Sequence, residues 1–156
     1  EEEMKGLAAE GAALRKELID SIQKDTESFT AYMNALGMPK NTDEEKAARK
    51  EAMQNGLKEA AEVPLAVAET ALKIFHVAGA VVERGNANAV TDGLVASMMA
   101  RTAVLSALLN VKINLGSIKD EEFVARMAAK VAELEKAAMD GEKAVMELSA
   151  LTRDLV

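Results

Sequence analysis

Apolar or small residues recur every three or four positions along almost the whole chain, which is the period of an α-helix and not the alternation of a strand. The first helical stripe predicts one helix of about ten turns. It should end at Gly37-Met38-Pro39, because glycine permits a left-handed cap and proline cannot continue a helix. The positions of this stripe are Met4, Leu7, Gly11, Leu14, Leu18, Ile22, Phe29, Tyr32 and Leu36.

A second helical segment begins at Thr42. Thr42 and Glu45 have the spacing of a capping box, in which each side chain binds a backbone N–H of the other residue. A helical stripe then continues from Leu57 to Val82. Pro64 interrupts this stripe, and because proline has no backbone N–H it either kinks one long helix or begins another.

The most apolar helix follows a turn at Gly85-Asn86. Between Leu94 and Leu109 its one charged residue is Arg101, and a helix that is apolar on nearly every side belongs in the interior of a domain. An acidic helix start between Ser117 and Glu122 then introduces a last long helix, which runs toward Val156. The sequence therefore predicts an all-α fold, a multihelical array of long helices around a buried central helix.

The composition excludes several classes of protein. The 156 residues have the length of one domain, and with 49% hydrophobic residues the chain should fold. Because there is no Cys and one His, disulfides, thiolate chemistry and a metal site are not expected. The net charge of -7 argues against nucleic acid as a partner. No apolar run approaches about 20 residues without a charge, so we expect no membrane segment and a cytoplasmic location.

A carboxylate occupies a position that helical spacing assigns to the core of the first helix. The stripe runs Leu18, Ile22, Asp25 and Phe29. An unpaired buried carboxylate is costly, so Asp25 needs a partner, a proton or a water-filled pocket. A structural ion pair or a cap accounts for this residue as well as a catalytic acid does, and structural pairs are the commoner case.

The central helix carries two amides one turn apart. Asn110 and Asn114 lie on the same face as Ala103 and Ala107, whose small side chains leave room beside them. Two amides above such a groove are able to hold a planar heterocycle, but a polar helix end emerging from the core has the same pattern. Arg101, among apolar neighbours, must be paired or lie at a subunit interface.

The turn from Gly85 to Asn88 gathers short polar side chains before the central helix, where Thr91 or Asp92 is expected to act as the cap. Free backbone donors at such a helix start can bind an anion or a carbonyl oxygen. Most turns of this composition, however, are only turns.

Seven short strings resemble, in their order and spacing, the formiminotransferase-cyclodeaminase C-terminal family, which includes stand-alone bacterial methenyltetrahydrofolate cyclohydrolases. The resemblance covers nearly the whole chain. The strings are Asp25-Thr26-Glu27-Ser28-Phe29, Met38-Pro39-Lys40, Glu44-Glu45-Lys46, Val63-Pro64-Leu65, Gly85-Asn86, Thr91-Asp92 and Asn110-Val111-Lys112-Ile113-Asn114-Leu115.

The resemblance implies that residues 1–156 form a single cyclodeaminase-like helical domain. The family's pattern begins earlier, with a glycine-rich segment, so the domain is expected to lack that N-terminal part. It also implies a folate enzyme that is a homodimer or an assembly of dimers, with a tetrahydrofolate derivative as substrate and no cofactor beyond tetrahydrofolate as the carrier of the substrate.

The cyclodeaminase reaction converts formiminotetrahydrofolate to methenyltetrahydrofolate and ammonia. A folate nitrogen adds to the formimino carbon, and ammonia leaves the tetrahedral intermediate. The attacking nitrogen must lose a proton and the leaving nitrogen must gain one, so a single carboxylate can move both protons. On the family's motif, Asp25 is the residue expected to do so.

The resemblance implies roles for five further residues. Asn110 and Asn114 are expected to hold the pteridine or the one-carbon unit, and Asn86 and Asp92 to complete the rim of the pocket. Lys40 is placed to attract the glutamate carboxylates of the substrate, although an ordinary solvated lysine fits the same position.

Other functions remain open on the sequence. The nearest is methenyltetrahydrofolate cyclohydrolase, which uses water in the same kind of pocket. A non-catalytic helical dimerisation module is a second alternative, and an acyl or amide hydrolase is a third, disfavoured because the chain offers no evident nucleophile or metal ligands.

Overall fold

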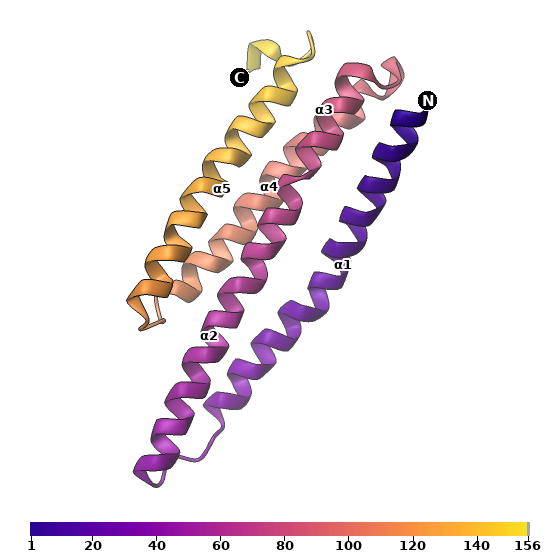
Figure 1. Cartoon of the computed structure of the whole chain (residues 1–156). Helices are drawn as coiled ribbons and strands as arrows, with labels where there is room; N and C mark the ends of the chain where they lie inside the picture. Colours follow the sequence, from indigo (N-terminus) through magenta and orange to yellow (C-terminus); the bar gives the residue numbers. More distant parts are fainter. Residues whose placement is uncertain (156) are drawn as a thin grey trace.

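The computed structural model describes residues 1–155 and is all-helical, with no strand in this range. The prediction of an all-α fold is confirmed. Figure 1 shows an elongated bundle in which the long helices run side by side. The helices are α1 (Glu2–Leu36), α2 (Asp43–Leu72), α3 (Ile74–Arg84), α4 (Val90–Leu115) and α5 (Glu121–Glu147), with short 3-10 turns at Ala87–Ala89 and Arg153–Leu155.

The core of the bundle lies where α4 meets α2, α3 and α5. Its most deeply buried side chains on α4 are Val104, Leu108 and Val111, all with 0% exposure. The expected central helix is therefore present. It is not enclosed on every side, however, because within residues 1–155 α1 packs on α2 and α3 and makes no close approach to α4. One face of α4 consequently remains in contact with solvent.

Two helix starts follow the predicted chemistry. The Thr42 hydroxyl accepts a hydrogen bond from the Glu45 N–H at 3.2 Å, and the Glu45 carboxylate accepts one from the Thr42 N–H at 3.3 Å, which completes the capping box. Asp120 caps α5 in the same way, accepting from the Phe123 N–H at 3.0 Å.

The start of α4 differs from the prediction. Thr91 and Asp92 lie inside the first turn of the helix, and no side chain caps it. Asn86 instead accepts a hydrogen bond from the Asn88 N–H at 3.0 Å and opens the 3-10 turn from Ala87 to Ala89, which leads directly into the helix. A local asparagine turn has replaced the expected cap.

Pro64 lies within α2, which runs unbroken from Asp43 to Leu72. The chain changes direction later, at Lys73. Proline at position 64 cannot donate to the carbonyl of Ala60, four residues earlier. That carbonyl is bound by the side-chain amide of Asn114 on α4 at 2.8 Å, so the helix continues without an unpaired acceptor.

The buried side of α1 corrects the predicted stripe. Its buried residues are Leu7, Leu14, Ser21, Ser28 and Ala35, spaced by seven. Ile22 and Phe29, expected in the core, are 68% and 62% exposed. Asp25 is exposed as well, so the expectation that its carboxylate is buried is wrong.

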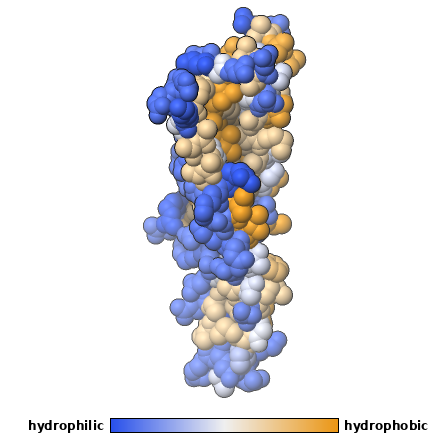
Figure 2. Space-filling model, turned by 90° about the vertical axis from the view of Figure 1, so that its right-hand side faces the viewer, coloured by the Kyte–Doolittle hydropathy of each residue, from blue (hydrophilic) through white to orange (hydrophobic). Residues whose placement is uncertain are grey.

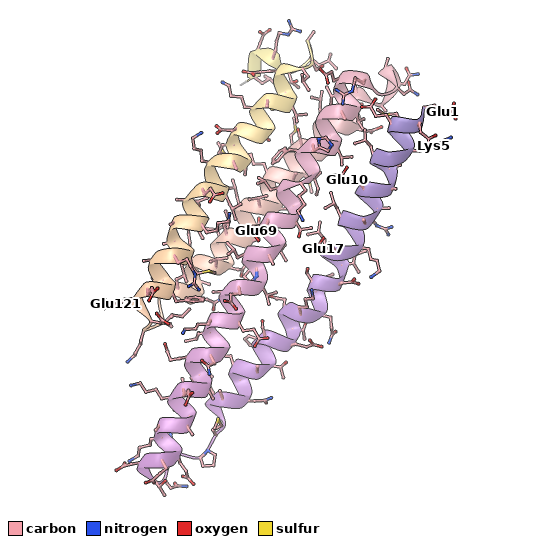
Figure 3. All side chains as sticks on the ribbon, viewed as in Figure 1. Glu1, Lys5, Glu10, Glu17, Glu69 and Glu121 are labelled. Carbon is pink, nitrogen blue, oxygen red and sulfur yellow. The ribbon has the colours of Figure 1, made fainter. Side chains whose placement is uncertain are left out.

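Small residues at the contact between α1 and α2 explain which face of α1 is buried. A Cβ added at Gly56 of α2 would lie 3.0 Å from the Cα of Tyr32, so the two backbones approach closely there, and Ser28 and Ala35 fit the contact. Earlier in α1, Glu17 points toward α2 (Figure 3), where the Thr70 hydroxyl donates a 2.7 Å hydrogen bond to its carboxylate. Ile22, Phe29 and Met33 are thereby left exposed to solvent.

Candidate functional site

A groove of about 400 Å³ lies between α1, α2 and α4. Pro64 and Val67 of α2 contribute to its apolar lining, together with residues of the two flanking helices. Its volume falls in the range of roughly 300–1,000 Å³ typical of small-molecule sites. The groove is open to solvent on the side where α1 and α4 do not meet. Its polar lining consists of Ser21, Asp25, Thr26, Ser106 and Asn110.

Asp25 brings a carboxylate to this groove from α1. It follows Ser21 and Ile22 by one helical turn, and all three line the groove. Its backbone carbonyl accepts from the Ser28 hydroxyl at 2.9 Å, while its side chain is exposed and has no ion-pair partner within residues 1–155. A carboxylate in the lining of a groove can act as a general acid or base toward a substrate bound there.

Asn110 faces Asp25 across the groove from α4. Ala103 and Ala107 line the groove next to it, as their spacing predicted. The Asn110 amide donates one hydrogen bond to the Ser106 carbonyl at 3.1 Å. An amide has two N–H groups and one acceptor oxygen, so capacity remains for a ligand that enters the groove.

Asn114 does not line this groove. Its side-chain nitrogen donates to the carbonyl oxygens of Ala60 at 2.8 Å and Asn110 at 3.0 Å. Both amide hydrogens are therefore used inside the protein. The expected pair of amides above one groove is not formed, because the second amide binds the backbone of α2.

The other predicted site residues lie at the two ends of the bundle. Asn86 and Asp92 are exposed near the start of α4, and a rise of 1.5 Å per residue places Asp92 about 27 Å from Asn110 along that helix. Lys40 is exposed in the turn between α1 and α2. Within one chain the structure therefore brings together Asp25 and Asn110, and it does not bring Lys40, Asn86 or Asp92 to their groove.

Arg101 is paired, which was one of its two expected states. Its Nε lies 3.3 Å from a carboxylate oxygen of Glu142 and 3.2 Å from the sulfur of Met139, both on α5. The Glu142 side chain is only 15% exposed, so this pair ties α4 to α5 away from the groove. In residues 1–155 no three His, Cys, Asp or Glu side chains are arranged as a metal site.

Thr26 and Ser106 are polar lining residues of the groove for which the sequence had predicted no role. The Thr26 hydroxyl donates to the Ile22 carbonyl at 3.0 Å, which holds the hydroxyl close to its own helix. Ser106 lies four residues before Asn110, so a search for polar residues one turn from that amide would have found it.

Comparisons with known proteins agree on one family. The family model described as Formiminotransferase-cyclodeaminase matches residues 1–133. A methenyltetrahydrofolate cyclohydrolase from Methylorubrum extorquens is 41% identical over 123 residues, which are 79% of this chain and 59% of that protein. A formimidoyltransferase-cyclodeaminase from Gallus gallus is 36% identical over 132 residues, 85% of this chain and 24% of that protein.

A solved structure has the same arrangement of helices. The crystal structure of a formiminotetrahydrofolate cyclodeaminase from Thermotoga maritima superposes with a TM-score of 0.75 at 29% identity, covering 92% of this chain and 66% of that one. The chain thus spans about three-fifths of its bacterial cyclohydrolase relative.

Proposed function

Because the chain belongs to the formiminotransferase-cyclodeaminase family, we propose that it acts on a tetrahydrofolate derivative in the groove between α1, α2 and α4. The observation that carries this proposal is the meeting of Asp25 and Asn110 in one groove of suitable size. In this proposal the Asp25 carboxylate transfers protons, and the Asn110 amide forms hydrogen bonds that orient the substrate.

The first reaction proposed is cyclodeamination of formiminotetrahydrofolate. The second folate nitrogen attacks the carbon of the formimino group, whose imino nitrogen is protonated, so a carbon–nitrogen bond forms and the carbon becomes tetrahedral. Asp25 takes the proton of the attacking nitrogen and delivers it to the former imino nitrogen. The bond to that nitrogen then breaks, ammonia leaves, and the methenyl cation remains. Charge and protons balance without a further reactant, and one carboxylate is sufficient.

Asn110 positions the substrate in this scheme. Its free amide hydrogen and its oxygen can bind the donors and acceptors of a pterin ring, while Pro64 and Val67 provide an apolar wall for the ring. Lys40 lies beyond the end of α1, about 16 Å or more from Asp25 by the helical rise, and is proposed to attract the glutamate tail. Asn114, Asn86 and Asp92 do not line this groove in a single chain.

Methenyltetrahydrofolate cyclohydrolase activity is the second candidate, and the 41% identity with a protein of that name favours it. Water then attacks the methenyl carbon and Asp25 accepts a proton from the water. Asp25 returns this proton to the folate nitrogen whose bond to the carbon breaks, the hydroxyl proton passes to solvent, and the formyl product remains. The groove is the same, and only the nucleophile differs. We place either reaction in the cytoplasm, in a homodimer or an assembly of dimers.

The two activities are separated by offering both substrates to the full-length protein. Cyclodeamination predicts that formiminotetrahydrofolate yields the methenyl chromophore together with one ammonia per turnover. Cyclohydrolase activity alone predicts that the chromophore of added methenyltetrahydrofolate disappears faster than in buffer and that no ammonia is released from the formimino compound. If neither substrate is turned over or bound, the proposal of a folate enzyme is overturned and a helical dimerisation module replaces it.

A further inference from the structure

An apolar trough of about 460 Å³ continues from the Asp25 groove along α1. The groove and the trough share Leu18 and Ile22, so the two cavities are continuous. Ile74 and Val77 of α3 line the other side of the trough. Figure 2, which views the molecule from the side of α1, shows hydrophobic residues reaching the surface between hydrophilic ones. No step of the reaction proposed above involves the far end of this trough.

Arg15 is, among residues 1–155, the one polar side chain in the lining of the trough. It is exposed and forms no hydrogen bond or ion pair with its side chain in that range. The nearest carboxylates along α1 have other partners, because Glu17 accepts a 2.7 Å hydrogen bond from Thr70 and Glu10 lies 3.9 Å from His76. The other arginines of the α-helices each contact a protein group, namely Arg49, Arg84, Arg101 and Arg126. Arg15 therefore has its N–H donors available for an anion in the trough.

Gly11 leaves space beside the head group of Arg15. Long side chains on a helix point toward its N-terminus, which directs the guanidinium of Arg15 over the turn that contains Gly11. Glycine inside a helix is disfavoured relative to alanine. Packing against α3 does not require it, because a Cβ at this position would lie 3.9 Å from Cγ1 of Val77, an ordinary contact distance. The missing side chain keeps this end of the trough open next to the cation.

The lining of the continuous cavity changes along α1 in the same order as the parts of tetrahydrofolate. The Asp25 groove has the polar side chains that the donors and acceptors of a pterin ring require. The trough that follows is apolar, as a benzoyl ring requires, and contains one cation, as a glutamate requires. The helical rise places Arg15 about 15 Å from Asp25 along α1. An extended benzoylglutamate with a hydrogen bond at each end has a similar length.

We propose that the trough binds the p-aminobenzoylglutamate part of the substrate, with the guanidinium of Arg15 paired to a carboxylate of the glutamate. The inference rests on the function proposed above, because the pterin then occupies the Asp25 groove. A guanidinium can bind a carboxylate through two parallel N–H···O bonds, which fix the position of the ligand as well as neutralising its charge. The benzoyl ring covers Ile19 and Ile22, which are otherwise 51% and 68% exposed.

Arg15 and Lys40 have different roles in this arrangement. The trough leads from Asp25 toward the N-terminal end of α1, whereas Lys40 lies beyond the C-terminal end of that helix and outside both cavities. Lys40 can attract the anionic substrate from a distance. Direct contact with the glutamate falls to Arg15, because its side chain lines the cavity.

A lipid surface is a less suitable occupant of the trough. Two helical stretches, Asp43–Arg84 and Ala87–Leu115, are long and apolar enough to cross a membrane, as core helices of soluble proteins also are. Neither stretch includes α1, which supplies most of the lining of the trough. The chain also carries a net charge of -7, which a bilayer with anionic head groups repels.

The test compares the binding of two ligands to the full-length protein. Tetrahydropteroyl methylamide has the pterin and benzoyl rings of tetrahydrofolate but ends in a neutral amide in place of the glutamate. Calorimetry gives the Kd of each ligand for the wild type, Arg15→Gln and Lys16→Gln, and circular dichroism verifies the fold. Lys16→Gln is the matched control, because it removes the same charge one residue away, from a lysine that pairs with Asp20 outside both cavities.

The wild-type protein and Lys16→Gln should bind tetrahydrofolate about tenfold more tightly than the methylamide, as expected for a hydrogen bond between charged groups. In Arg15→Gln this preference should disappear, while the affinity for the methylamide stays unchanged. Equal binding of the two ligands by the wild type overturns the proposal, as does a preference retained in Arg15→Gln. A preference lost to the same extent in Lys16→Gln also overturns it, because charge at a distance is then sufficient.

Ile19→Ser tests the apolar part of the trough. Ile19 lines the trough but not the Asp25 groove, and both ligands carry the benzoyl ring. The substitution should therefore weaken the binding of both ligands by the same factor, about threefold or more. Leu151→Ser is the control, because Leu151 is 67% exposed and lies beyond α5. Affinities equal to those of Leu151→Ser would place the benzoyl ring elsewhere and overturn the proposal.

Turnover of the formimino and methenyl substrates by the same proteins separates this inference from the function on which it rests. Binding of tetrahydrofolate with a preference that depends on Arg15, but without turnover of either substrate, keeps the subsite and refutes the enzyme activity. Turnover by a protein whose preference does not depend on Arg15 does the reverse. If neither ligand binds to the wild type, the folate function and the subsite are both overturned.

Discussion

The side-chain amide of Asn114 donates a 2.8 Å hydrogen bond to the carbonyl oxygen of Ala60, across the contact between α4 and α2. Ala60 is four residues before Pro64, which has no N–H to offer that carbonyl. An asparagine on one helix thus compensates for a proline inside another. This contact explains why α2 passes through Pro64 without ending, and it gives Asn114 a structural role.

A double-mutant cycle between Asn114 and Pro64 tests this compensation. Asn114→Ala should destabilise the protein by about 1–2 kcal/mol, because the half-buried Ala60 carbonyl loses its donor. In a Pro64→Ala background the backbone N–H returns, so the same substitution should cost measurably less. Urea denaturation followed by circular dichroism measures both differences. Equal costs in the two backgrounds would show that Asn114 does not act through the carbonyl left free by the proline.

Asp120 provides a test that depends on pH. The hydrogen bond from Lys58, at 2.6 Å, and then the one from the Phe123 N–H lower the pKa of Asp120 below its ordinary value of 3.8. A carboxyl whose pKa is lowered by folding stabilises the folded state above its unfolded pKa, and this contribution is lost as the pH falls through the folded pKa. Asp120→Asn keeps an oxygen that can cap α5 but loses the charge.

The melting temperature of Asp120→Asn should therefore be lower than that of the wild type near neutral pH. The difference should be constant above about pH 5 and shrink as the pH falls below 4, where the wild-type carboxylate also becomes protonated. Thermal unfolding at pH 3, 4, 5 and 7 measures this. A difference that stays the same at pH 3 would mean that the cap geometry, and not the charge, is responsible.

Asn110→Ala tests the positioning role of the amide in the groove. Loss of hydrogen bonds to the substrate should raise KM about tenfold, equivalent to about 1.4 kcal/mol, while stability changes little because the side chain is exposed. Asn34→Ala is the matched control, since Asn34 is an exposed helical asparagine outside the Asp25 groove. A KM equal to that of Asn34→Ala would remove Asn110 from the site.

Much of the fold was predictable because the signals are local. The Thr42 and Glu45 capping box, the helix end before Gly37 and the acidic start of α5 each depend on residues within one turn of each other. The interior of α4 was predictable from its composition. Which face of α1 is buried was not predictable from the sequence. It depends on the close approach of Tyr32 to Gly56 on α2, and the spacing of residues along α1 does not indicate that contact.

The site was predictable to a smaller extent. Asp25 and Asn110 do line the same groove. Asp25 was singled out because its position in the helical stripe predicted a buried carboxylate, whereas in the structure the side chain is exposed. From its spacing, Asn114 was predicted to bind ligand beside Asn110. Its hydrogen-bond partner on α2, the carbonyl of Ala60, lies 54 positions earlier, and local spacing does not indicate so distant a contact. Asn86, Asp92 and Lys40 share motifs with the family, but a motif does not show which end of a long helix its residues occupy.

Asp25→Asn tests the central claim most directly, namely that this carboxylate moves the proton in the groove. The substitution keeps the size and polarity of the side chain and removes its ability to accept a proton. The control is Asp20→Asn, a neighbouring exposed aspartate of α1 whose ion pair with Lys16 lies outside the groove. Methenyl formation and consumption by the full-length protein are measured under saturating substrate, with circular dichroism to verify the fold. The account predicts that kcat falls about 10²–10⁴-fold in Asp25→Asn and stays near the wild-type value in Asp20→Asn. A folded Asp25→Asn protein with the turnover of the wild type would contradict it.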